Sequence, residues 1–403
     1  MNGIDSNYIP LMRAEGLEWR DRGGREIANI FAFFGERGVS CFRLRIWFDG
    51  EGPSRLLYAL ELAREAVGAG YQLHPVVFLS EGWADLYKQP APKGWERLDV
   101  DSRSLLAAEF VGKVVKALGE LLDRCAYFQV GNEVDYGVCG VFARDKKKRR
   151  SVDWLKRRVW LLEARILKAA FGALRDSTSK PVSLHLGRWF DTGFARAFLD
   201  AMEGFGVECD VLSFSFYPTH TGAPLDRLEG LKEVAAERGV RLAVAEYAYP
   251  SRRVSGQFWF MNNPSPGYPL TLEGQARWLR DFLIYCKRLG VYAVFYWSPA
   301  VLGEEHGEAF GRCLAARYAA RLRVGSHVPF PRERCGEAGC GLASLRGLRS
   351  PRQPYSILTV TMPVSGVLYP VGFARFRRFL RAAFARFLLP ALRSFGVVVG
   401  ARF

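Results

Sequence analysis

Two glutamates follow short apolar runs at positions far apart along the chain. Glu133 comes after Tyr127–Gly131 and Asn132, and Glu246 comes directly after Arg241–Ala245. A carboxylate at the end of a buried strand projects into a partly desolvated mouth, where its pKa can rise. Two carboxylates held about 5–5.5 Å apart suit a double displacement at a sugar anomeric carbon. One would attack that carbon, and the other would protonate the leaving oxygen and later activate water.

Either glutamate alone is weak evidence for a catalytic site, because a salt-bridged carboxylate or a solvated loop carboxylate would give the same sequence pattern. Two of them after the fourth and seventh apolar runs, the first preceded by Asn132, are more specific.

Apolar runs and helical patterns alternate through about residue 300. The eight runs are Gly3–Asp5, Cys41–Phe48, Gln72–Leu79, Tyr127–Gly131, Pro181–Leu186, Val211–Phe216, Arg241–Ala245 and Tyr292–Tyr296. The helical patterns between them are Glu26–Arg37, Arg55–Ala69, Leu105–Leu122, Leu155–Leu174, Phe194–Gly204, Leu228–Arg238 and Gln275–Leu289. Eight strand–helix repeats predict an α/β fold, a (β/α)8 TIM barrel with its active site where the strands end.

A doubly wound open sheet is the alternative architecture, but no G-x-G-x-x-G follows the first run and no Walker loop occurs. We expect a catalytic barrel over residues 1–322 and a basic C-terminal extension over 323–403. Within the extension, Phe373–Leu392 has the pattern of a basic amphipathic helix. It is predicted to pack against the barrel, and the alternative is weak contact with an anionic membrane surface.

The charge of the chain is concentrated in the extension. The net charge is +16, and residues from 338 onward carry ten arginines with no lysine and no acid, so the first 337 residues carry +6 (16 minus 10). This distribution does not indicate nucleic-acid binding. No secretory signal precedes the first run and no stretch of eighteen apolar residues occurs, which leaves localisation open: cytoplasmic by default, extracellular for a processed form.

Several short motifs in order along residues 3–300 resemble one family, the arabinogalactan endo-β-1,4-galactanases of glycoside hydrolase family 53, within the clan A barrels. The motifs are Gly3–Ser6, Arg43–Trp47, Trp83–Asp85, Gln89 through Gly94–Trp95, Gly131–Glu133, His185–Leu186, Ser215–Pro218, Glu246 with Tyr249–Pro250, Gly274–Gln275, and Phe295–Trp297 with Pro299. No single fragment is decisive, but their order and placement after the apolar runs support the resemblance.

The resemblance implies roles for individual residues. Glu133 would be the acid/base and Glu246 the nucleophile. Asn132 would hydrogen-bond the 2-hydroxyl of the sugar at the cleavage point. Arg45 and Tyr217 would hold the nucleophile ionised and oriented, a task that suits the rigid donors of a guanidinium.

Further residues are expected to contact the substrate. Trp297 would give an apolar floor for a galactose ring, and core packing is its alternative. Trp83, Asp85 and His185 are also expected in the substrate site. For His185 an equally supported alternative is a histidine whose hydrogen bonds are all made within the protein. For the two arginines of Arg43–Arg45, the alternative is a buried barrel ion pair.

The chain departs from the family pattern at three places. The usual His-Tyr-Ser-Asp is Phe78–Glu81 here, Trp-Glu-Pro is Trp297–Pro299, and His-Leu-Asp is His185–Gly187. Both glutamates remain, so the reaction type is better supported than the substrate. The predicted function is retaining, endo-acting cleavage of β-1,4-galactan or a related galactose-containing polysaccharide. The alternatives are a clan A β-glycosidase of another specificity, a catalytically silent carbohydrate-binding barrel, and a membrane-associated scaffold.

Two loops bear on cofactors and substrate. Many bacterial relatives hold calcium in the seventh loop, but Ser251–Tyr268 contains no Asp or Glu, so we expect no metal, and the mechanism requires no cofactor. The basic run Arg144–Arg150, continued by Lys156–Arg158, is predicted to lie on the active-site face. It would attract an anionic glycan, such as one that carries uronic acids, and a solvated charge run is the alternative. Oligomeric state is not indicated.

Overall fold

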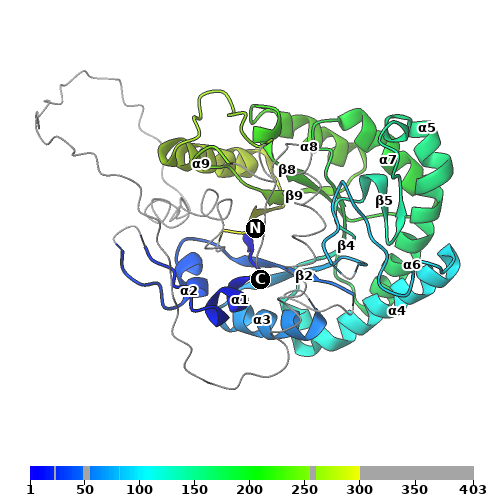
Figure 1. Ribbon diagram of the computed structural model, residues 1–403, viewed down its shortest axis with the longest axis horizontal. Helices are drawn as coiled ribbons and strands as arrows, with labels where there is room; N and C mark the ends of the chain where they lie inside the picture. The colour runs from blue at the N-terminus through cyan, green and yellow to red at the C-terminus, as the bar shows by residue number, and fades with distance from the viewer. Residues whose placement is uncertain (22–23, 49–54, 81, 255–259, 300–403) are drawn as a thin grey trace, which may run out of the picture. The chain divides into compact units, whose positions relative to one another are not determined.

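The barrel predicted from the sequence is present. The computed structural model describes residues 1–21, 24–48, 55–80, 82–254 and 260–299. Parallel strands close into an eight-stranded barrel in the order β1-β10-β9-β8-β7-β4-β3-β2 (Figure 1). The barrel strands are β1 (Asn2–Asp5), β2 (Cys41–Ile46), β3 (Gln72–Val77), β4 (Phe128–Val130), β7 (Val182–Leu186), β8 (Val211–Phe216), β9 (Arg241–Tyr247) and β10 (Ala293–Trp297).

Helices surround the strands as an outer layer (Figure 1). They are α1 (Ile9–Ala14), α2 (Ile30–Gly35), α3 (Leu56–Gly68), α4 (Val100–Leu118), α5 (Val152–Leu155), α6 (Leu161–Ser177), α7 (Thr192–Gly204), α8 (Arg227–Glu237) and α9 (Leu272–Leu289). Shorter 3-10 segments are Gly119–Arg124, Val134–Tyr136, Lys148–Arg150 and Pro218–His220, and a π-helical turn, Lys156–Trp160, joins α5 to α6.

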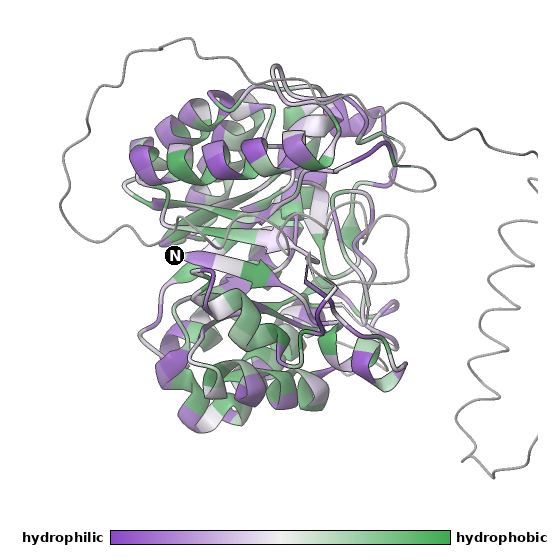
Figure 2. Ribbon diagram, turned by 90° about the vertical axis from the view of Figure 1, so that its left-hand side faces the viewer, coloured by the Kyte–Doolittle hydropathy of each residue, from purple (hydrophilic) through white to green (hydrophobic). Residues whose placement is uncertain are grey.

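The distribution of buried and exposed residues explains why these segments form these elements. The strands are almost wholly buried, and hydrophilic residues gather along the outer faces of the helices (Figure 2). Side chains cap the helix starts: Asp99 accepts a hydrogen bond from the Ser102 amide before α4, and Thr271 accepts one from the Gly274 amide before α9. At its other end α9 stops at Gly290, whose φ of 70° is left-handed.

Some local structure was not predicted. Neither α1 nor the two-stranded antiparallel hairpin of β5 (Gly137–Val138) and β6 (Val141–Phe142) was expected. The predicted helix Leu155–Leu174 is divided by the π-helical turn between α5 and α6. Residues beyond 299 lie outside the described residues, so the boundary at 322 and the amphipathic helix over 373–392 remain predictions.

A bulge in β9 determines which side chains meet at the open end of the barrel. Phe214 pairs with Val244, but the next β8 residue, Ser215, pairs with Glu246, so β9 carries one extra residue there. Its register against β10 shifts at the same level. Bulges bend a strand and re-aim its side chains. The predicted strand end at Ala245 therefore becomes a bulge that sets Glu246 opposite Ser215. Across the described parts of the chain, no helix combines the length and apolar character that crossing a membrane requires.

Candidate active site

Glu133 lies just beyond β4 on a tight turn. Gly131 has a φ of 76°, and a Cβ at that position would lie 2.5 Å from Cγ1 of Val134. Glu133 itself has a φ of 49° and a ψ of 58°. Non-glycine residues in the left-handed region cost about 1–3 kcal/mol and cluster at functional sites. The turn therefore holds the Glu133 backbone in a conformation that non-glycine residues seldom adopt.

Both oxygens of the Glu133 carboxyl group have protein partners. Ser215 Oγ donates a hydrogen bond to Oε1, and the Leu86 amide donates to Oε2 over 2.9 Å. Burial, followed by the proximity of Glu246, raises the pKa of Glu133 to about 8, while these two hydrogen bonds act in the opposite direction. Glu133 is therefore mainly protonated at neutral pH.

Glu246 is held by different partners at the end of β9. Its side chain is buried, Oε1 accepts a hydrogen bond from Arg43 Nη1 over 2.8 Å, and Oε2 accepts one from the Tyr217 hydroxyl over 3.0 Å. Burial raises the pKa of Glu246, but the Arg43 guanidinium and the Tyr217 hydroxyl act to lower it. A buried carboxylate with a guanidinium and a phenol aimed at its two oxygens is fixed in orientation.

Arg43, rather than Arg45, forms the contact with Glu246. Both arginines are fully buried and point the same way from β2, because they are two residues apart on one strand. Arg43 also bonds Asp5 Oδ2 (2.5 Å) and Asn132 Oδ1 (2.8 Å). Arg45 Nε lies 3.0 Å from Asp5 Oδ1, and its guanidinium lies over the Trp83 ring at 5.2 Å. Arg43 is thus the arginine that donates a hydrogen bond to Glu246, whereas Arg45 acts on Glu246 through space, and the orienting role predicted for Arg45 stays a prediction.

A hydrogen-bonded network joins the two glutamates beneath the site. Asn132 Oδ1 lies within hydrogen-bonding distance of Arg43 Nη2 (2.8 Å) and His185 Nδ1 (3.0 Å). The other ring nitrogen of His185 lies 3.0 Å from Ser215 Oγ, which bonds Glu133. Burial, followed by the charge of Arg43, lowers the pKa of His185 well below its ordinary value, so the ring is neutral. His185 is fully buried with both nitrogens engaged, which favours the reading of a histidine satisfied within the protein.

The β3–α4 loop supports Glu133 from the other side. Trp83 Nε1 donates to Asp85 Oδ2 (2.8 Å), while Asp85 Oδ1 accepts the amides of Tyr87 (2.8 Å) and Lys88 (3.0 Å). Gln89, which was noted only as part of a motif, donates from Nε2 to the backbone oxygens of Asn132 (2.7 Å) and Glu133 (3.2 Å). In the structure Asp85 thus orders this loop, and its predicted contact with substrate stays a prediction.

Trp83 and Trp297 lie near each other, both half-buried. Their ring centroids are 6.4 Å apart with the planes at 67°, an edge-to-face arrangement. Two half-buried indoles beside a pair of buried carboxyl groups are the side chains that a sugar ring would pack against. The arrangement therefore fits the predicted apolar floor.

Residues 1–327 match the sequence profile of glycosyl hydrolase family 53. The chain belongs to this family.

The relatives of this family 53 member are distant. An endo-β-1,4-galactanase of Bacillus subtilis is 26% identical over 349 residues, which cover 79% of this chain and 77% of the relative. An arabinogalactan endo-β-1,4-galactanase A of Emericella nidulans is 24% identical over 307 residues, or 74% and 84% of the two chains. A solved fungal β-1,4-galactanase superposes with a TM-score of 0.66 at 22% identity, over 78% of this chain and 98% of the other. The fold is thus shared.

Three positions at which this family 53 member departs from the expected pattern directly follow the barrel strands β3, β7 and β10. Phe78 is fully buried, with its ring centroid 5.8 Å from that of Trp83. Ser298 is buried and its amide donates to the Asp5 carbonyl over 2.8 Å. At Gly187, an added Cβ would lie 3.0 Å from Cδ of Glu133. A side chain at position 187 would therefore contact the carboxyl group of Glu133, and here glycine leaves that space open.

Metal ligands do not gather in the described part of this family 53 chain. Among those residues no group of three or more His, Cys, Asp or Glu could hold an ion. Residues 255–259 of the seventh loop lie outside the described residues, so the expectation of no calcium site in Ser251–Tyr268 stays a prediction.

Proposed function

We propose that this protein is a retaining, endo-acting glycoside hydrolase, an arabinogalactan endo-β-1,4-galactanase or an enzyme for a related galactose-containing polysaccharide. In this proposal Glu246 is the nucleophile and Glu133 the acid/base. The observation that carries it is the different environment of the two carboxyl groups. Pairs of titratable groups whose surroundings push their pKa values apart supply the acid and the base of a reaction.

The first step needs one protonated and one ionised carboxyl group. Glu133, with its pKa near 8, holds the proton that the glycosidic oxygen takes as the bond breaks. Glu246 attacks the anomeric carbon and forms a glycosyl–enzyme ester. Arg43 and Tyr217 orient the attacking carboxylate, because they donate to its two oxygens.

The second step reuses the same groups. Glu133, now ionised, takes a proton from water, and that water releases the sugar from Glu246 with its original anomeric configuration. Asn132 Nδ2 donates one hydrogen to the Ala84 carbonyl over 3.0 Å, which leaves its second hydrogen for the 2-hydroxyl of the sugar. That contact strengthens as charge develops in the transition state.

The proposed substrate rests on the relatives, which include proteins named as galactanases at 24–26% identity. Phe78, Gly187 and Ser298 alter the surroundings of the reacting sugar, so specificity is the part of the proposal most in need of measurement. The decisive experiment incubates the protein with β-1,4-galactan and a panel of other β-linked polymers and follows oligosaccharide products by chromatography. An endo-acting galactanase releases oligosaccharides from galactan early in the digest.

Chemical rescue assigns the two roles separately. With an activated aryl β-glycoside and azide, the variant Glu133→Ala should give a β-glycosyl azide, because the nucleophile survives. Glu246→Ala should give the α-glycosyl azide, because azide then attacks the opposite face directly. Hydrolysis near the parent rate in Glu133→Gln or Glu246→Gln would reject the assignment, and glycan binding by the parent without any hydrolysis would point to a silent barrel.

A further inference from the structure

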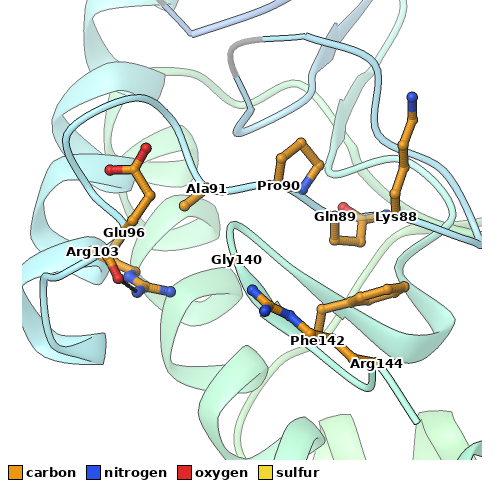
Figure 3. Close-up of a pocket in the computed structure, with 9 residues that line it drawn as sticks. All are labelled: Lys88, Gln89, Pro90, Ala91, Glu96, Arg103, Gly140, Phe142 and Arg144. Atoms are coloured by element: carbon orange, nitrogen blue, oxygen red, sulfur yellow. Dashed lines mark hydrogen bonds between the residues drawn. The ribbon is translucent and has the colours of Figure 1, made fainter. Parts of the chain in front are cut away.

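A pocket of about 470 Å³ lies beside the candidate active site, between the β3–α4 loop, the start of α4 and the β5–β6 hairpin (Figure 3). Its volume falls within the range of about 300–1,000 Å³ that is typical of small-molecule sites. It is lined by Lys88, Gln89, Pro90, Ala91, Glu96, Arg103, Gly140, Phe142 and Arg144. None of the proposed catalytic side chains is among them, so this is a separate site.

One loop separates the pocket from the acid/base. Gln89 lines the pocket, and its side chain donates to the backbone oxygens of Asn132 and Glu133. Its own carbonyl accepts the Gly140 amide over 3.0 Å, which ties the loop to the hairpin. The pocket thus lies on the side of Glu133, the group that would protonate the leaving oxygen. In the proposed mechanism, the part of the polysaccharide that continues from the leaving group would lie on this side of Glu133.

Arg103 provides a fixed positive charge in the pocket. Its Nε, Nη1 and Nη2 atoms donate to the carbonyl oxygens of Trp95 (3.2 Å), Cys139 (3.2 Å) and Glu96 (3.1 Å). These bonds use three of the five guanidinium hydrogens, and all three go to uncharged acceptors. The guanidinium is held in place while its charge and two of its hydrogens remain for another partner.

Arg144 adds a second cation to the pocket. In Figure 3 the guanidinium groups of Arg103 and Arg144 point toward the same part of the pocket, whereas the Lys88 amine extends away from them. Within the described residues, neither arginine forms an ion pair with a carboxylate. The one acidic side chain of the lining, Glu96, accepts the Gly94 amide over 2.8 Å. Two converging guanidinium groups without a counter-ion among these residues are suited to an anion that arrives with a ligand.

Two residues of the basic run predicted to attract an anionic glycan have contacts within the protein. Arg149 is buried between the rings of Tyr136 and Phe142, 4.9 and 4.7 Å from their centroids, and its Nε donates to the Ala143 carbonyl over 2.7 Å. Lys148 lies 5.4 Å from the Trp154 ring centroid. Of the whole run, Arg144 alone lines the pocket. The pocket therefore involves one side chain of the run, and attraction of an anionic glycan by the run as a whole stays a prediction.

We propose that this pocket binds the carboxylate of a uronic acid residue carried by the polysaccharide, on the leaving-group side of the cleavage point. The forks of Arg103 and Arg144 match a planar carboxylate, which can accept two parallel N–H hydrogen bonds. Phe142, Pro90 and Ala91 offer the apolar surface against which a sugar ring packs. The assignment to a polysaccharide residue rests on the proposed function, whereas the preference for an acidic over a neutral sugar rests on the pocket alone.

A binding experiment tests the pocket without any hydrolysis. Methyl β-glucuronide and methyl β-glucoside differ only in a carboxylate against a hydroxymethyl group, and each is titrated into the full chain at low salt and followed by NMR. The glucuronide should bind at least about tenfold more tightly, and added salt should weaken it. Arg144→Gln should reduce that affinity about tenfold. Lys146→Gln removes the same charge from an exposed side chain of the run outside the pocket, and should change affinity less than twofold.

Equal affinity for the two glycosides would overturn the proposal. Equal losses of affinity for the glucuronide in Arg144→Gln and Lys146→Gln would also overturn it, because they would indicate diffuse electrostatic attraction. Its consequence for catalysis is measured as kcat/KM on neutral galactan and on galactan that bears uronic acids. Arg144→Gln should lower kcat/KM on the acidic polymer about tenfold relative to the neutral one, and an unchanged ratio contradicts the proposal. Failure of the parent protein to cleave any galactan would reject the proposed function and leave the glycoside titration as an independent result.

Discussion

The hydroxyl of Ser215 on β8 donates its hydrogen bond to Oε1 of Glu133 on the turn after β4. A serine has one hydroxyl hydrogen, so when Glu133 is ionised that hydrogen is committed to the carboxylate. His185 Nε2, 3.0 Å from the same Oγ, must then be the donor to Ser215. His185 Nδ1 then accepts from Gln129 Nε2 at 3.1 Å, and its 3.0 Å approach to Asn132 Oδ1 is not a hydrogen bond in this state. Ser215 thus ties the ionisation of Glu133 to the tautomer of a buried histidine.

Ser215→Ala should raise the pKa of Glu133, because the lost hydrogen bond stabilises the ionised form. Glu133 must be protonated for the first step, so activity of the parent should fall as pH rises through about 8. In the variant this basic limb of kcat/KM should move to higher pH by about one pH unit, since a hydrogen bond to a charged group contributes about 1.5–3 kcal/mol. The measurement is a pH–rate profile from about pH 4 to 10.

The matched control is Ser213→Ala, two residues earlier on β8. Ser213 is equally buried, but its Oγ lies 2.6 Å from Ser183 Oγ rather than on a glutamate. The basic limb of the kcat/KM profile of Ser213→Ala should coincide with that of the parent. A limb that stays fixed or moves to lower pH in Ser215→Ala would show that the hydroxyl does not favour the ionised form of Glu133.

Arg43→Lys should slow turnover far more than Arg45→Lys. A lysine keeps the charge but lacks the fork that reaches Asp5, Glu246 and Asn132 together. We expect kcat to fall by about 10²-fold or more, because preorganised groups around the reacting centre typically contribute about 10²–10³-fold. Arg45→Lys, which leaves the hydrogen bonds of Glu246 with Arg43 and Tyr217 intact, should keep kcat within about fivefold of the parent value. The kcat values of the two variants are measured by steady-state kinetics on one galactan preparation. Equal losses of kcat would show that Arg45 contributes to turnover as much as Arg43.

The architecture was predictable because each strand is a short apolar run and several of the helical patterns end at a glycine, as at Gly70, Gly239 and Gly290. Periodicity cannot, however, report a bulge. One extra residue in β9 leaves the apolar pattern of Arg241–Tyr247 unbroken but decides that Glu246 pairs with Ser215. The hairpin Gly137–Phe142 was missed for a related reason, since strands of two residues are too short to carry a pattern.

Within the site, sequence identified the groups but not their partners. Arg43 and Arg45 share one face of β2, so strand geometry alone could not choose between them. The choice depends on the level at which β2 pairs with β1: Asp5 lies beside Arg43 in that register. Ser215 and Gln89 were present in the motifs, but the roles they take depend on contacts 82 and 44 residues away along the chain.

Gly187→Ala should impair the acid/base without unfolding the barrel. The added Cβ would lie 3.0 Å from Cδ and 3.2 Å from both oxygens of Glu133, closer than comfortable contact, so the carboxyl group must shift. Shifts of this kind at a reacting group can cost up to about 10²-fold, and we expect kcat to fall at least about tenfold. Gly204→Ala on α7 meets no atom within 4 Å and serves as the control. Parent-like kcat in Gly187→Ala would mean that Glu133 tolerates the contact.

Glu133→Gln should make the protein more heat-stable at alkaline pH, since a glutamine cannot ionise. In the unfolded chain Glu133 titrates near its ordinary value of about 4.3, whereas burial raises its folded pKa to about 8. As pH rises between these values the unfolded state loses its proton first, so the parent loses stability until the pH passes the folded value. The variant escapes that loss, and the Tm difference between variant and parent should grow by a few degrees from pH 4.5 to pH 9. Glu120→Gln, at an exposed glutamate, should show a Tm difference that does not depend on pH in this way. Parallel melting curves for Glu133→Gln and the parent across this range would mean that ionising Glu133 carries no cost in the folded protein, which would remove the basis for its role as the acid.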